Sequence, residues 1–142
     1  MKKLISISVM MLFVISLITC SADNKTAKQA KTTIRPTAKV EVYYFHYTRR
    51  CMTCNAVEKE SKAAIAALYP VQFKKGLITF KSVNLDEKGS EVLAKKCQAE
   101  GQALLIISGS KRQDLTDKGF MYAINSPEKL KAELKKAIDP LL

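Results

Sequence analysis

The sequence predicts an α/β domain with a central mixed four-stranded sheet and helices on both faces. Segments with strand and helix patterns follow one another in the order β-α-β-α-β-β-α over residues 39–142. A strand–helix–strand unit that feeds a hairpin and a closing helix gives parallel and antiparallel neighbours in one sheet. The first strand is apolar at nearly every position, as is typical of a central strand covered on both faces. No internal repeat and no glycine-rich phosphate loop interrupts this order.

The first predicted strand runs from about Lys39 to His46 and is filled with valine, tyrosine and phenylalanine around Glu41. The helix that follows is interrupted by Pro70, and Gly76 is a C-terminal stop for any continuation. Its apolar residues recur with helical spacing at Ala56, Val57, Ala64, Ile65 and Leu68.

Residues 77–85 alternate in polarity and predict a second strand. Ser90 is then expected to cap a helix, because its hydroxyl can accept a hydrogen bond from a free backbone N–H. That helix would turn Val92, Leu93 and Cys97 inward. The short apolar run 103–107 predicts a buried strand.

A turn at 108–110 leads into a weaker edge strand near residues 113–116. Residues 119–124 are apolar, and their pattern does not distinguish a helix from a strand. Ser126 and Pro127 mark the start of the closing helix, since proline is favoured in the first helical turn. Its buried face consists of Leu130, Leu134 and Ile138.

Residues 1–19 read as a signal peptide. Lys2 and Lys3 precede an apolar run over 4–18, which is too short and wrongly flanked to be a membrane span. We therefore expect the protein to be exported, to a compartment where a disulfide can persist.

Two interpretations of the processing site remain open. Leu17-Ile18-Thr19-Cys20 resembles the lipobox of bacterial lipoproteins, which would make Cys20 the lipidated first residue and a membrane anchor in the periplasm or cell envelope. Alternatively, Cys20-Ser21-Ala22 is a small-x-small site with cleavage before Asp23. Residues 20–38 are polar and predict a flexible tether.

The formal net charge of +11 favours nucleic acid, anionic lipid or acidic partners. The basic residues are scattered, however, and exported proteins rarely meet nucleic acid. The sequence therefore predicts a solvated basic surface near anionic head groups and no nucleic-acid binding.

Cys51-Met52-Thr53-Cys54 lies between the first strand and its helix, a placement typical of redox chemistry. Cys51 would sit at the helix N-terminus, where free N–H groups and the helix dipole favour a thiolate. Arg49 and Arg50 add positive charge, and Cys54 fits the resolving thiol. A structural disulfide and half of a metal site remain as alternatives.

Two further residues carry open interpretations. His46, the one histidine, is either a general base or soft-metal ligand, or a core or rim residue. Cys97 is either a small buried hydrophobe or a third thiol. Cys51, Cys54 and Cys97 together would suit arsenite or copper(I).

A C-x-x-C at the end of the first core strand, in this order of elements, resembles the thioredoxin fold over about residues 39–142. Val83-Asn84-Leu85-Asp86 with the helix 90–96 resembles the second strand and third helix of thioredoxins. Gly101-Gln102-Ala103-Leu104-Leu105 resembles the segment that faces the cysteines.

A narrower resemblance is to short exported proteins labelled the ArsF-type subunit of nitrophenyl-compound nitroreductases. It rests on Tyr43-Tyr44-Phe45-His46, Thr48-Arg49-Arg50-Cys51 with Cys54, Asp114-Leu115-Thr116 and Gly119-Phe120. The resemblance implies membership of a group of exported thioredoxin-like proteins.

Three positions depart from thioredoxins. Arg50 replaces the aromatic residue before the first cysteine, and Phe45 replaces the buried acid that accepts a proton from the second thiol. Ala103 stands where the resemblance implies a cis-proline. Since a cis bond before any other residue costs ~2.5–4 kcal/mol, we expect a trans bond there.

The leading hypothesis is an exported, lipid-tethered thiol–disulfide redox protein that exchanges with a protein thiol or disulfide. A soft-metal or arsenite module and a non-catalytic accessory subunit with a structural disulfide are the alternatives. Nothing supplies a flavin or nicotinamide site, and no cofactor is expected.

Overall fold

The computed structural model describes residues 39–142 of the 142-residue chain. The predicted signal peptide, Cys20 and the tether lie outside the described residues. The elements are β1 (Val40–His46), α1 (Met52–Leu68), α2 (Pro70–Lys74), β2 (Ile78–Asn84), α3 (Ser90–Cys97), β3 (Ala103–Ser108), β4 (Lys111–Asp114), α4 (Thr116–Tyr122), α5 (Pro127–Ile138) and the 3-10 turn η1 (Asp139–Leu141).

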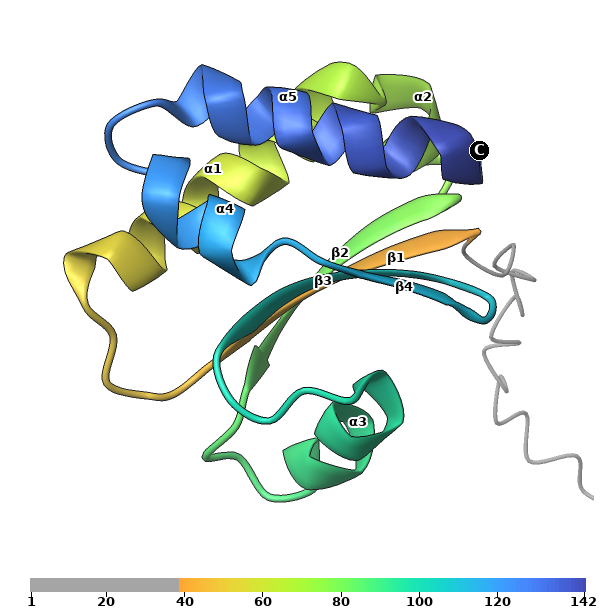
Figure 1. Cartoon of the computed structure of the whole chain (residues 1–142). Helices are drawn as coiled ribbons and strands as arrows, with labels where there is room; N and C mark the ends of the chain where they lie inside the picture. Colours follow the sequence, from red (N-terminus) through yellow and green to blue (C-terminus); the bar gives the residue numbers. More distant parts are fainter. Residues whose placement is uncertain (1–38) are drawn as a thin grey trace, which may run out of the picture. The chain divides into compact units, whose positions relative to one another are not determined.

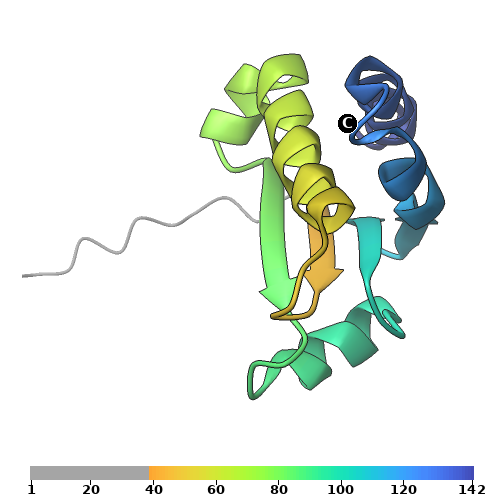
Figure 2. The ribbon, with the colours of Figure 1, turned by 90° about the vertical axis from the view of Figure 1, so that its left-hand side faces the viewer.

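The four strands form one mixed sheet in the order β2-β1-β3-β4. β1 is parallel to β2, and the β1–β3 and β3–β4 pairs are antiparallel. Helices α1, α2, α4 and α5 cover one face, whereas α3 alone covers the other (Figure 1). The view turned by 90° shows the same separation (Figure 2). The predicted fold class, a mixed four-stranded sheet with helices on both faces, is therefore confirmed.

Alternate side chains of β1 enter two different cores, because successive residues of a strand point to opposite faces. Val40, Val42 and Tyr44 pack in the core beneath α1 and α5. Tyr43 and Phe45 pack in a smaller core beneath α3. β1 is thus buried on both faces, as its composition predicts, and its C-terminal end brings the chain to the cysteines.

Pro70 ends α1 as predicted and also begins a short helix, α2, in whose first turn it stands. The missing N–H of proline does no harm there, since the first N–H groups of a helix have no partner within the helix. Gly76 then adopts a φ of +72°, a left-handed conformation that favours glycine. The chain reverses at this point into β2.

Ser90 does not cap α3. Gly89 is the N-cap residue, with a φ of +94°, and no side chain caps this helix. The Ser90 hydroxyl instead donates to the Leu85 carbonyl at 3.1 Å, which ties the first residue of the helix to the end of β2.

The predicted edge strand near 113–116 is also corrected. Ser108 pairs with Lys111 across a two-residue turn, so β4 begins and ends two residues earlier than expected. Thr116 lies outside the strand pairing and is the first residue of α4. Its Oγ1 accepts a hydrogen bond from the Leu104 N–H at 3.0 Å. The stretch left unassigned by its pattern is largely this helix. Within residues 39–142, no helix is long and apolar enough to cross a membrane.

Candidate functional site: the Cys51–Cys54 disulfide

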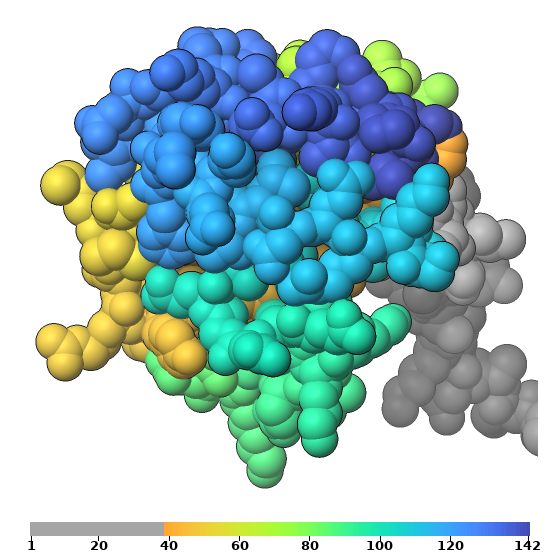
Figure 3. All heavy atoms as spheres, viewed as in Figure 1, coloured from red at the N-terminus to blue at the C-terminus, as the bar shows by residue number. Residues whose placement is uncertain are grey.

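Cys51 and Cys54 form a disulfide at the N-terminus of α1. Cys51 is the N-cap residue, with extended backbone angles, and its Sγ accepts a hydrogen bond from the Cys54 N–H at 3.1 Å. Cys51 is exposed, whereas Cys54 is only 4% exposed and points toward the core. Cys51 is therefore the solvent-facing member of the pair and Cys54 the sheltered one. The first turn of α1 lies at an edge of the domain (Figure 3).

The turn before Cys51 is held by residues at the C-terminal end of β2 and just after it. The Thr48 N–H donates to Asp86 Oδ2 at 2.7 Å, and Asn84 Nδ2 donates to Thr48 Oγ1 at 3.0 Å. The backbone hydrogen bond from Thr48 to the carboxylate lowers the pKa of Asp86. Parallel pairing of β1 with β2 explains this, because it places the C-terminal ends of both strands at one edge of the sheet.

Arg50 does not point to the disulfide. Its guanidinium forms an ion pair with Glu58 of α1, and Nη2 lies 2.6 Å from His46 Nε2. Burial would raise the pKa of Glu58, but hydrogen bonds from Arg50 and Ser82 outweigh it, and the pKa is lowered. The guanidinium expected to stabilise a Cys51 thiolate is thus engaged with Glu58 and His46, and that role stays a prediction. Arg49 is exposed to solvent.

His46 is buried, 4% exposed, and both ring nitrogens are engaged. Nδ1 lies 2.9 Å from the Tyr47 carbonyl, which can only accept, and Nε2 faces a guanidinium that can only donate. These two partners assign the donor role to Nδ1 and the acceptor role to Nε2. In this arrangement neither nitrogen offers a free lone pair to a substrate or metal.

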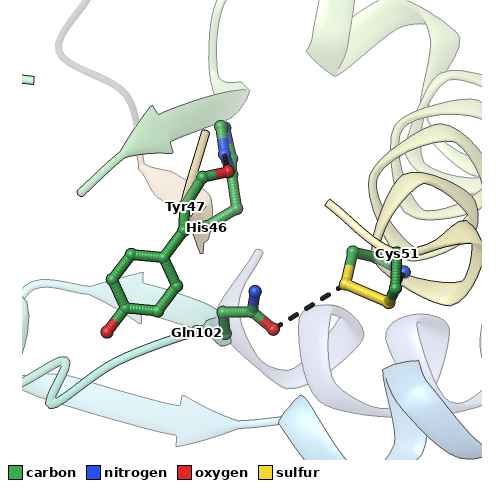
Figure 4. Close-up of a disulfide and its surroundings, with 5 residues drawn as sticks. His46, Tyr47, Cys51 and Gln102 are labelled. Atoms are coloured by element: carbon green, nitrogen blue, oxygen red, sulfur yellow. Dashed lines mark hydrogen bonds between the residues drawn. A yellow bond between two sulfur atoms is a disulfide. The ribbon is translucent and has the colours of Figure 1, made fainter. Parts of the chain in front are cut away.

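Gln102 is a residue of the site whose side chain was not predicted from the sequence to have a functional role. Its Oε1 lies 3.9 Å from Cys54 Sγ, across from the disulfide (Figure 4). The segment 101–105 was expected to face the cysteines, and Gln102 carries the only hydrogen-bonding side chain in it. Ala103 follows as the first residue of β3; no cis peptide bond occurs among the described residues, so the bond before it is trans as predicted.

Cys97 lies on the other face of the sheet from α1. It is buried among Tyr43, Phe45 and Leu105, and burial raises the pKa of its thiol. The interpretation as a small buried residue is supported, and the proposed set of three thiols is not assembled. In the part of the chain that the structure describes, no group of three histidine, cysteine or acidic side chains could hold a metal ion.

Two hollows flank the loop that carries Gln102. One, of about 670 Å³, lies between this loop, Arg112 and the start of α4. The other, of about 390 Å³, lies between Tyr47, Leu85 and α3. The loop residues Ala99 to Gly101 line both, so the surface beside the disulfide is concave on two sides of one loop.

No family model and no curated protein matches the chain. One solved structure, described as "Structure of a malarial protein", is 22% identical and covers 69% of this chain and 96% of its own, with a TM-score of 0.44. This likeness has no bearing on the function.

Proposed function

We propose that this chain is an exported thioredoxin-like protein, similar to the ArsF-type group, whose Cys51–Cys54 pair cycles between disulfide and dithiol. The observation that carries the proposal is the geometry of the pair. An exposed sulfur sits at the positive end of a 17-residue helix, and its mate is bonded behind it one turn on. Thiol exchange requires this division between an accessible attacking sulfur and a sheltered resolving one.

The helix supplies the stabilisation that a Cys51 thiolate needs. The Cys54 N–H already points at Cys51 Sγ, and the first turn of α1 contains no acidic residue to oppose a negative charge. Helix N-termini lower thiol pKa values below the usual ~8.5. In this proposal the backbone, rather than Arg50, is the main source of the stabilisation.

The cycle balances without a cofactor. The Cys51 thiolate attacks a disulfide of the partner, which forms a mixed disulfide and releases one partner thiolate. Cys54 loses its proton to solvent or to the released thiolate, and its sulfur attacks Cys51 Sγ. The Cys51–Cys54 bond forms, the second partner thiolate leaves, and two electrons have passed to the partner. The reverse sequence oxidises a partner dithiol.

Two alternatives have less support. A metal or arsenite module would need ligands beyond the pair, and Cys97 is across the sheet from it. A structural disulfide normally joins distant parts of the chain, whereas this one spans three positions of a single helix start. Export and tethering through Cys20 belong to the same proposal and rest on the sequence. A protein thiol or disulfide held near the membrane is the expected partner.

The test is a trapping experiment on the whole chain. We expect Cys54→Ser to accumulate a mixed disulfide with a small disulfide such as oxidised glutathione, and Cys51→Ser to accumulate far less. Cys97→Ser is the matched control; it retains Cys51 and Cys54 and, like the parent, should accumulate little adduct. A Cys51 thiol with a pKa near 8.5, together with no trapped adduct, would remove the basis of the proposal.

A further inference from the structure

Four lysines cluster at one end of the domain, although they are far apart in the sequence. Lys39 precedes β1, Lys74 and Lys75 lie at the end of α2, and Lys111 is the first residue of β4. All four residues are exposed, and within residues 39–142 none of them forms an ion pair. We call these four residues the lysine end.

Hydrogen bonds hold the segments of the lysine end against one another. The Lys39 N–H donates to the carbonyl of Leu77, two residues after Lys75, at 2.8 Å. On the other side, Ser108 Oγ donates to the Lys39 carbonyl at 2.8 Å. Ser108 is in turn paired with Lys111 in the β3–β4 hairpin. Lys39 therefore lies between the other two segments.

The acidic groups at this end do not cancel its charge. Asp139, which follows α5, is engaged by Lys135 and by the hydroxyl of Tyr69, the residue before α2. The C-terminal carboxylate lies at the same end (Figure 1) and opposes one of the four lysines. The lysine end therefore keeps a net positive charge.

The polypeptide also enters the domain at the lysine end. The predicted tether, residues 20–38, joins directly to Lys39, and Cys20 is the predicted site of lipidation. Because such a tether is flexible, the anchor alone does not set which surface of the domain faces the bilayer. A positive surface around the point of attachment would set it, since anionic head groups attract lysines.

The disulfide lies at the opposite end of the domain. β1 begins next to Lys39 and runs for seven residues, which span ~23 Å at ~3.3 Å per residue. The start of β1 and the first turn of α1 lie at opposite ends of the domain (Figure 1). A bilayer in contact with the lysine end therefore leaves Cys51 facing away from it.

Building on the export and tethering in the proposed function, we propose that the lysine end binds anionic phospholipid head groups and turns the Cys51–Cys54 disulfide away from the membrane. Each lysine held near an anionic bilayer strengthens binding about five-fold. Cys51 is then presented to protein partners in the aqueous space.

The experiment measures how much of the processed chain sediments with lipid vesicles. The chain comprises residues 20–142 and carries Cys20→Ser, which prevents lipidation. Vesicles of phosphatidylcholine with about 30% phosphatidylglycerol are compared with phosphatidylcholine alone at ~0.1 M salt, where the Debye length is ~10 Å. We expect binding to the anionic vesicles only, and loss of this binding at ~1 M salt, where the Debye length is ~3 Å.

Lys75→Gln/Lys111→Gln should weaken binding to the anionic vesicles about 25-fold, from about five-fold per lysine. Lys88→Gln/Lys129→Gln is the matched control, because it removes the same charge from the turn after β2 and from the first turn of α5. It should weaken binding by less than about three-fold. Equal effects of the two double variants, equal binding to neutral vesicles, or no binding to anionic ones would overturn the inference.

The orientation of the disulfide has its own readout. Dithiothreitol, a small uncharged reductant, should reduce the Cys51–Cys54 bond as fast in the vesicle-bound chain as in the free chain. Markedly slower reduction on vesicles would place the disulfide against the bilayer and refute the orientation. Vesicle binding does not require thiol exchange, so a chain that binds as expected but traps no mixed disulfide contradicts the redox cycle and leaves this inference standing.

Discussion

Arg50→Met separates the role that the sequence predicts for Arg50 from the contacts that the structure shows. If Arg50 stabilises a Cys51 thiolate, its loss raises the pKa of that thiol. If it serves the ion pair with Glu58 and the contact with His46, its loss destabilises the fold. The structure favours the second outcome, because a guanidinium paired with a carboxylate presents little net charge to a neighbouring sulfur.

The magnitude follows from the contacts and their exposure. A hydrogen bond to a charged group contributes ~1.5–3 kcal/mol, and Arg50 makes two such contacts. Its side chain is 22% exposed and that of Glu58 is 27% exposed, so water recovers part of the loss. We expect the free energy of unfolding to fall by about 2 kcal/mol, and the pKa of the Cys51 thiol to change by less than about half a unit.

Urea unfolding of the oxidised chain measures the first quantity, and the absorbance of the thiolate during a pH titration of the reduced chain measures the second. Arg49→Met is the matched control, since Arg49 is exposed. Glu58→Gln and the double variant with Arg50→Met complete a double-mutant cycle, which should give a coupling of about 1 kcal/mol or more. Unchanged stability together with a pKa higher by a full unit would refute the argument.

Three other predictions follow from single contacts. Gly119→Ala would place a methyl group 3.2 Å from Val57 Cγ1 in the packed core beneath α1, and should lower the free energy of unfolding by ~1–3 kcal/mol in thermal melts; an unchanged melting temperature would contradict it. Gln102→Glu should raise the pKa of the Cys54 thiol by like-charge repulsion, whereas Gln102→Met should not. The chemical shift of the Cys54 β-carbon during a pH titration of the reduced chain measures this pKa. Equal effects of the two variants would exclude a charge mechanism. The pKa of Glu58 is lower in the folded chain than in the unfolded chain, so its ionised form stabilises the fold. This stability is present above the unfolded-state pKa of ~4.3 and is lost as the pH falls through the folded-state pKa, so urea midpoints should drop on acidification and drop less in Glu58→Gln. An equal drop in the variant would assign the loss to other acids.

The parts of the fold that depend on local pattern could be predicted from the sequence. β1 is marked by an apolar run and α1 by helical spacing, and the cysteines fall between them. The short helices and the edge strand were harder to predict. α2 and α4 have five and seven residues, too few for a periodic pattern to stand out, and the start of β4 depends on which residues form the hairpin turn.

The side-chain contacts of the site could not be predicted, for two different reasons. Arg50 has a long flexible side chain, and only the packed structure selects Glu58 and His46 as its partners. The location of Cys97 depends on which face α3 covers. The handedness rule places the helix of a parallel β-α-β unit, but β3 is antiparallel to β1, so the rule gives no face for the helix that leads into it.

The position of the disulfide argues against a purely structural role on energetic grounds. A cross-link stabilises mainly by restricting the unfolded chain, and the effect grows with the loop it closes, from about 2 kcal/mol for a loop of about four residues to ~4.7 kcal/mol for one of about 100. Cys51 and Cys54 are three positions apart, so they close nearly the smallest loop available. The Cys54 N–H that donates to Cys51 Sγ is also available to a thiolate, which means that reduction leaves the start of α1 with its cap. A bond that stabilises the fold less than a long-range cross-link would, and whose loss leaves the helix cap in place, is suited to being broken and remade.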